Sequence, residues 1–180
     1  MSVGVFPPPA APDKLVISPF SACSLGVELA AFATAAPASA TWPTTNKAFY
    51  YPFTISQGLT VTKMWAINGA AVSGNVDIGI YNAAGARLVS KGSTAQSGTN
   101  AMQVFDVTDT VLGPGLYFLA LNMDNTTGTF ILSIVAGFAD LAMGWYTQAV
   151  GAVTLPATAT FASSTSGIVP LFGLEANTVY

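Results

Sequence analysis

Seven short runs rich in β-branched and aromatic residues dominate the middle of the chain and constrain its fold most strongly. In order they read AFYYPFTI, LTVTKMWAI, NVDIGIYN, ARLVSKG, AMQVFDV, GLYFLALNM and TFILSIV. This composition is typical of β-strands, and the segments between the runs are rich in Gly, Asn, Ser and Pro, which favour turns. Seven strands without intervening helices predict an all-β, antiparallel β-sandwich of the jelly-roll or Greek-key type.

Alternation within the runs predicts which side chains face the core. In residues 59–67 it places one set of side chains on the apolar face: Leu59, Val61, Lys63, Trp65 and Ile67. In residues 75–82 it separates Val76, Ile78 and Ile80 from Asp77, Gly79 and Tyr81, which predicts a half-buried strand.

Residues 79–93 predict a hairpin with its turn at Asn82–Gly85, because Asn and Gly tolerate positive φ. We expect Leu88 to face the core on the returning strand. The opposite face would then carry Arg87, Val89 and Lys91. We interpret the two cations as solubilising residues at a strand tip rather than as a ligand site.

The ends of the chain are expected to behave differently from its middle. Residues 1–13 contain Pro7, Pro8 and Pro9, which predict an extended arm because proline lacks an N–H and fixes φ. The arm is either a loose terminus or a segment that docks on a neighbouring subunit through Phe6. Residues 14–180 are expected to form one β-sandwich domain with its core strands at about 48–135.

Two segments of that domain have less regular patterns. Ala-rich residues after Lys14 could form a strand, a short helix or an irregular cover. Residues after 135 form a long excursion rich in Gly and Ala, poor in strand periodicity until IVPLFGLE. Trp145 and Tyr146, in a predicted loop at 144–150, either anchor an interface or fold back over the core.

Composition leaves little room for catalysis or for charged ligands. Only 7% of the residues are charged, the net charge is −3, and there is one cysteine and no histidine. Catalytic triads and the common zinc sites need histidine, and nucleic-acid binding needs basic clusters. We therefore expect no enzyme activity, cofactor, metal, nucleic acid or membrane partner, an inert Cys23, and no cleaved leader.

The acidic residues have ordinary structural explanations. Asp106 and Asp109 are expected where a strand ends and a turn begins, and Asp124 is expected in a turn. Asp77 lies within a predicted strand and is the least ordinary acid, for which a paired or hydrogen-bonded structural role is favoured over catalysis.

Residues 50–125 resemble a β-sandwich module of tailed-bacteriophage virion proteins. The resemblance is carried by YYPFTISQGLTVTKMWAINGAAVSGNVDIGIYNAAGARLVSKGSTAQSGTN and FDVTDTVLGPGLYFLALNMDN. A lead-in from about Ile17 extends it to Ile17–Asn125. It implies a virion location and brings no catalytic residues with it.

Two roles follow from this resemblance and from the low charge. The first is a capsid cement or decoration protein, a homo-oligomer bound to the major capsid protein or to other virion proteins. Its expected interface residues are Phe6, Pro7, Pro8, Pro9, Trp145 and Tyr146.

The alternative is a tail or fibre module that binds a receptor or a host-surface glycan. Its sugar-stacking candidates would be Trp42, Tyr50, Tyr51 and Trp65, although Tyr50 and Tyr51 are adjacent and should face opposite sides of a strand. A glycoside hydrolase lacks a credible acid pair.

Overall fold

The computed structural model describes residues 15–17, 39–134, 146–163 and 168–178, and within these residues it contains strands and no helix. The strands are β1 Leu15–Ile17, β2 Ser39–Thr41, β3 Lys47–Ile55, β4 Leu59–Ile67, β5 Asn75–Asn82, β6 Arg87–Ser90, β7 Thr94–Ala95, β8 Met102–Leu112, β9 Gly115–Met123, β10 Thr129–Ile134, β11 Tyr146–Ala149, β12 Ala162–Ser163, β13 Val169–Pro170 and β14 Phe172–Thr178. The predicted all-β fold is confirmed.

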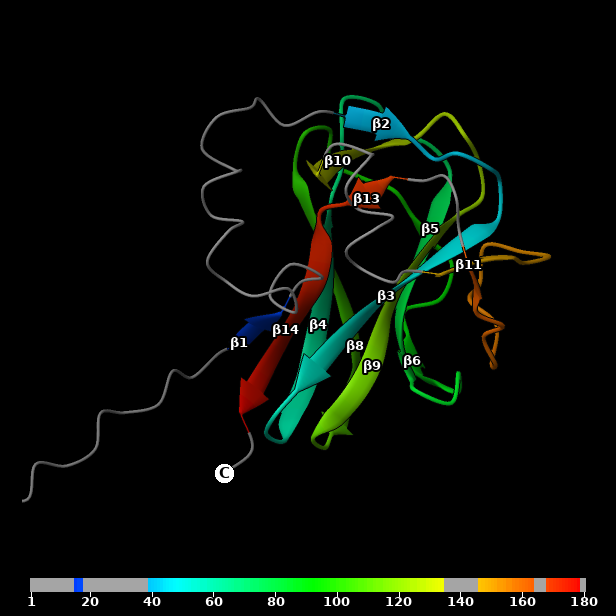
Figure 1. Ribbon diagram of the computed structural model, residues 1–180. Helices are drawn as coiled ribbons and strands as arrows, with labels where there is room; N and C mark the ends of the chain where they lie inside the picture. The colour runs from blue at the N-terminus through cyan, green and yellow to red at the C-terminus, as the bar shows by residue number, and fades with distance from the viewer. Residues whose placement is uncertain (1–14, 18–38, 135–145, 164–167, 179–180) are drawn as a thin grey trace, which may run out of the picture.

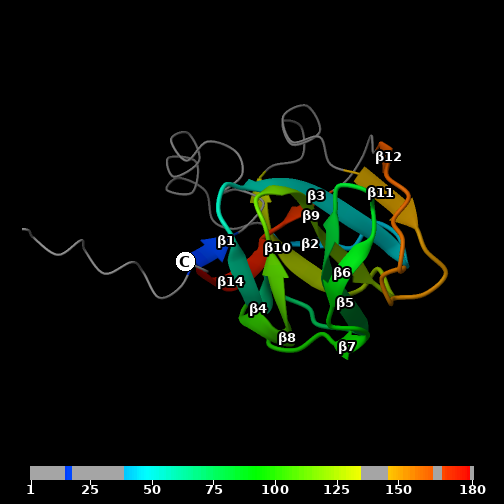
Figure 2. The same cartoon turned by 90° about the horizontal axis from the view of Figure 1, so that it is seen from below.

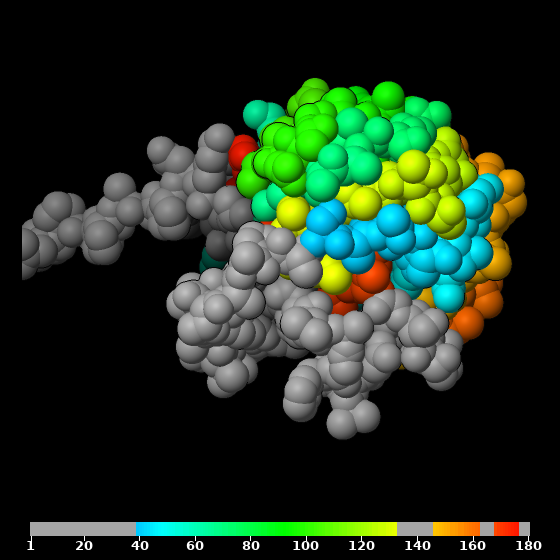
Figure 3. Space-filling view, turned by 90° about the horizontal axis from the view of Figure 1, so that it is seen from above, coloured from blue at the N-terminus to red at the C-terminus, as the bar shows by residue number. Residues whose placement is uncertain are grey.

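Antiparallel sheets packed against each other form the body of the molecule (Figures 1 and 2). One sheet has the order β1-β14-β4-β8, and the opposing sheet has the order β12-β11-β3-β9-β5-β6, with β7 beside β5. A third, small sheet of order β13-β10-β2 lies at one end. Figure 3 shows the residues around β2 in blue beside the yellow residues of β10, as their register requires.

The main core lies between the two large sheets. Its fully buried aromatic residues include Trp42, whose ring meets Phe49 and Phe130 edge-on at centroid distances of 4.7 and 5.6 Å. Strand β14 adds Phe172, Leu174 and Ala176, so the core extends well beyond the strands expected at 48–135. The IVPLFGLE segment therefore holds part of an inner strand, paired with β1 on one side and β4 on the other.

The alternation expected in β4 is wrong beyond Val61. Leu59 and Val61 face the core as predicted, but Met64 and Ala66 then take the buried positions, and Trp65 is only half-buried. The register with β8 shifts between Val61 and Lys63, and such a bulge moves all later side chains to the opposite face.

The hairpin turn is confirmed, whereas the prediction of which β6 side chains face the core is wrong. Gly85 has φ +82°, and the Asn82 side-chain oxygen accepts hydrogen bonds from the N–H groups of Ala84 and Ala86. Val89 lies in the core, and Leu88 is 40% exposed. A register shift between β5 and β6 next to Tyr81 reverses the expected order, again through a bulge.

Candidate functional site

The outer face of the larger sheet is covered by its own chain. Residues 150–161, which we call the strap, cross this face between β11 and β12, and a second apolar cluster lies beneath them. Its buried members are Ala48, Tyr50, Tyr81, Phe118, Ala120, Leu155 and Ala159. The strap buries Asp77, Gly79 and Tyr81, so the prediction that residues 75–82 are half-buried is wrong: both faces of β5 are buried.

Asp77 binds the main chain of two separate segments. Its side chain is fully buried. One carboxylate oxygen accepts a 2.8 Å hydrogen bond from the N–H of Gly92, and the other accepts a 2.8 Å bond from the N–H of Leu155 in the strap. Burial raises the pKa of Asp77, and these N–H donors and the nearby Arg87 partly oppose that effect. The structural role expected for this acid is what the geometry shows.

Arg87 also holds the strap, which corrects its interpretation as a solubilising residue. Its guanidinium donates a hydrogen bond to the carbonyl of Leu155, and its own backbone N–H donates to the carbonyl of Ala157 at 2.9 Å. Lys91 is exposed, as expected for a solubilising residue. The difference arises because the strap passes over the start of β6.

Two further side chains of the sheet bind strap carbonyls. The Tyr81 hydroxyl donates to the carbonyl of Pro156 at 2.6 Å. The Asn122 amide donates to the carbonyls of Ala152 and Val153 at 3.0 and 2.7 Å. Polar side chains of the sheet therefore hold the strap through its peptide groups.

Two glycines make room for the strap. A Cβ on Gly79 would lie 2.7 Å from the carbonyl oxygen of Val89 and 3.0 Å from Leu155 Cδ1. A Cβ on Gly85 would lie 2.8 Å from the carbonyl oxygen of Ala159, whose N–H donates back to the Gly85 carbonyl at 2.7 Å. Close approach of strap and sheet thus depends on the absence of side chains at both positions.

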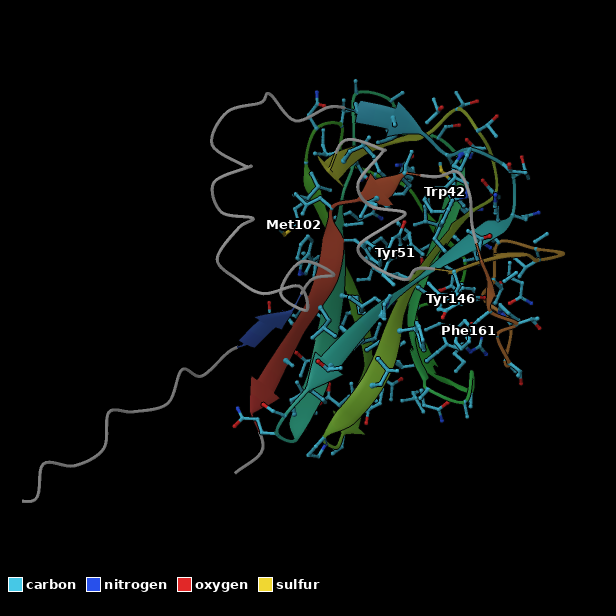
Figure 4. The ribbon with its side chains drawn as sticks, in the orientation of Figure 1. Trp42, Tyr51, Met102, Tyr146 and Phe161 are labelled. Atoms are coloured by element: carbon cyan, nitrogen blue, oxygen red, sulfur yellow. The ribbon has the colours of Figure 1, made fainter. Side chains whose placement is uncertain are left out.

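Tyr146 is the one predicted interface residue that the structure describes. It lies in β11, paired with Tyr50, where a loop at 144–150 was expected. Its ring is half-buried and lies 5.4 Å from that of Phe161 and 5.8 Å from that of Phe118. Figure 4 shows Tyr146 and Phe161 beside each other on one side of the molecule. Phe6, Pro7, Pro8, Pro9 and Trp145 lie outside the described residues.

Most aromatic residues considered for sugar stacking are buried. Trp42, Tyr50 and Tyr51 have no exposed surface, and Trp65 is half-buried. Tyr50 and Tyr51 do face opposite sides, one in each apolar cluster. The Tyr50 hydroxyl donates to Gln148 at 2.9 Å, and burial raises the pKa of Tyr50 to about 12, so the phenol stays neutral at ordinary pH.

The three other acids considered from the sequence, Asp106, Asp109 and Asp124, lie in β8 or in the turn after β9. Asp106 and Asp109 lie within β8 and are exposed, so their expected placement at the end of a strand is wrong. Asp124 does lie in a turn and accepts a hydrogen bond from the N–H of Asn75. Among the described residues no three acidic, Cys or His side chains gather as a metal site would require. On this face, polar side chains of the sheet form hydrogen bonds with the backbone of the chain's own strap.

The strap itself could not be anticipated from its sequence. Residues 150–161 are mostly small and lack alternation, so nothing in them indicates what they cover. The usable signal lay in the sheet, where Asp77 interrupts the apolar strand NVDIGIY. A buried acid needs nearby donors, and here another segment of the chain supplies them.

The described part of the chain contains no helix that is long and apolar enough to cross a membrane. In the comparisons with known proteins, no family model, no curated protein and no solved structure matches this chain.

Proposed function

We propose that the chain is a non-enzymatic structural protein of a tailed-phage virion, acting as a capsid cement or decoration protein. The observation that carries this proposal is the use of the polar groups beneath the strap. Asp77, Arg87, Tyr81 and Asn122 all bind main-chain groups of the strap. These side chains use their hydrogen bonds to fix the strap on the outer face of the sheet. They therefore support a rigid structural element and do not line a cleft that could receive a substrate.

The surface chemistry supports a role in permanent protein contacts. With 7% charged residues, the surface is covered mainly by small and weakly polar side chains. Large apolar side chains are exposed on β8, where Met102 and Val111 are 56% and 70% exposed. A surface of this kind has little charge to desolvate when a neighbouring protein covers it.

We propose that the N-terminal arm attaches the protein to the capsid. In this proposal Phe6 is buried against the major capsid protein or a neighbouring copy, and Trp145 with Tyr146 provides a second contact. Tyr146 presents only part of its ring, because Phe118 and Phe161 cover the rest.

The alternative, a glycan-binding module on a tail or fibre, has one observation in its favour. Tyr146 and Phe161 form a half-exposed aromatic pair on the outer side of the larger sheet. Sugar rings stack on such surfaces, although these two rings are tilted by 44° and do not form a flat platform.

The test is to separate heads from tails of purified particles and to measure the amount of the chain in each fraction. The cement proposal expects a fixed ratio to the major capsid protein in heads. Recovery of the chain in the tail fraction, at a few copies per particle, would overturn it in favour of the alternative.

A further inference from the structure

Among the described residues, the long strand β8 forms one edge of the smaller sheet. Within the described residues β8 pairs with β4 and with no other strand. Met102 and Val104, near its start, are 56% and 54% exposed. Figure 4 places Met102 on the opposite side of the molecule from Tyr146 and Phe161, so this edge is separate from the strap and its cluster.

The hydrogen-bond pattern shows which main-chain groups reach this edge. The N–H of Asn68 donates to the carbonyl of Ala101 at 3.0 Å, so Ala101 directs its polar groups toward β4. In an antiparallel ladder this direction alternates, which turns the N–H and C=O groups of Met102, Val104 and Asp106 away from β4. The opposite strand agrees, because the N–H of Ile67, which is paired with Met102, donates instead to Leu171 at 2.9 Å.

The same three residues carry a defined pattern of side chains on the outer face. Met102 lies opposite Ile67 and Val104 opposite Trp65, which gives two apolar cross-strand pairs. Asp106 lies opposite Lys63, and Lys63 is also opposite Glu175 on its other side. One cation between two acids, with the exposed Asp109 beyond them, leaves this end of the face negative.

The bulge limits how far another strand could extend. The register with β4 shifts between Asp106 and Thr110, so the regular part of the edge ends at Asp106. Bulges and charges at an edge protect a sheet against pairing with its own copies. The two-fold antiparallel pairing of β8 with a second copy that uses all three outward-facing residues is centred on Val104. It would place Met102 of one copy against Asp106 of the other, which buries a carboxylate against an apolar side chain.

We propose that Met102–Asp106 bind an extended segment of a partner protein as an added antiparallel strand. Complementarity fixes the chemistry of that segment: a basic residue opposite Asp106, followed at alternate positions by apolar residues opposite Val104 and Met102. Main-chain hydrogen bonds would supply the affinity, and the alternating side chains would supply the specificity. This inference does not depend on a virion location and holds for any partner with that pattern.

The test uses the full chain and a capped heptapeptide with the sequence Thr-Lys-Thr-Val-Thr-Val-Thr. Binding is followed by amide chemical-shift changes. We expect saturable shifts at residues 102–106 and binding about threefold to fivefold weaker when glutamate replaces the lysine, the size of a cross-strand charge pair. The Asp106→Lys variant should reverse the preference between the two peptides.

Two further variants separate edge pairing from surface adhesion. Val104→Pro removes an N–H that faces the open edge and none that faces β4, so it should abolish binding and leave the chain folded. Val111→Thr, on the same strand beyond the bulge, should leave binding unchanged. Equal affinity for both peptides, shifts elsewhere on the surface or no saturable binding would overturn the proposal. So would self-association that Val104→Pro removes, because it would show a second copy at this edge.

Discussion

The carboxylate of Asp77 accepts a hydrogen bond from the backbone N–H of Leu155, which lies 78 residues further along the chain, at 2.8 Å. This bond joins β5 of the larger sheet to the strap that covers it. Both groups are buried, so neither can turn to water if its partner is removed. The contact therefore connects the stability of the sandwich with the closure of its outer face.

Replacing Asp77 by Ala should destabilise the fold and loosen the strap. The N–H groups of Leu155 and Gly92 lose their acceptor, and we expect the free energy of unfolding to fall by roughly 2 kcal/mol. Urea unfolding measures this change, and proteolysis within residues 150–161 should accelerate in parallel. Asp109→Ala is the matched control, since Asp109 is exposed, and it should change stability by less than about 0.5 kcal/mol. Equal effects of the two substitutions would contradict the anchoring role of Asp77.

The free energy of unfolding should depend on pH through the titration of Asp77. Burial raises its pKa above the ordinary value of 3.8, so the folded chain retains this proton to higher pH than the unfolded chain. The contribution of Asp77 is then fully present below the unfolded pKa and is lost as pH rises through the folded pKa. Relative to Asp77→Asn, which does not titrate, the wild-type chain should lose stability as pH rises through that window. A relative gain would show that the two N–H donors outweigh burial.

Gly79 should not tolerate a side chain. In Gly79→Ala the new methyl group would lie 2.7 Å from the carbonyl oxygen of Val89, a backbone atom that cannot move aside without disturbing β6. We expect a loss of roughly 1–3 kcal/mol in the free energy of unfolding, as for other overpacked sites. Gly151→Ala in the strap is the control, because a Cβ there meets nothing within 4 Å. If both variants unfold at the same denaturant concentration, close packing at Gly79 is not a determinant of the fold.

Deleting residues 2–12 should separate assembly from folding. The proposal expects the truncated chain to keep its melting temperature, because an arm with three consecutive prolines cannot extend the interior of a sheet. Incorporation into particles should fall sharply, as judged by the amount of chain that sediments with heads. Normal incorporation would remove the arm from the mechanism, and a large drop in melting temperature would show that the arm belongs to the domain's own core.

The strands could be predicted from local composition. Which side chains of each strand point to the core, and which segment covers the outer face of the larger sheet, depend on contacts between residues far apart in the sequence. The runs at 59–67, 75–82 and 115–123 coincide with β4, β5 and β9. Bulges beside Lys63 and Tyr81 reversed the expected sides of β4 and β6, because a single register shift leaves no mark on the alternation of one strand.

In the candidate site, too, single residues could be recognised from the sequence, but their contacts with residues far along the chain could not. Asp77 stood out within its strand, but its donors at Gly92 and Leu155 come from segments with no pattern of their own. Tyr146 could be recognised as an aromatic residue of interest. Its place in a strand beside Tyr50 could not, because that pairing joins residues far apart in the chain.

The most direct test of the proposed cement role is the thermal stability of heads with and without this chain. Particles assembled without it should release their genome at a lower temperature, as followed by a DNA-binding dye, and adding purified full-length chain should restore the original temperature. Heads that rupture at the same temperature in both cases, with the chain associated instead with tails, would contradict the proposal.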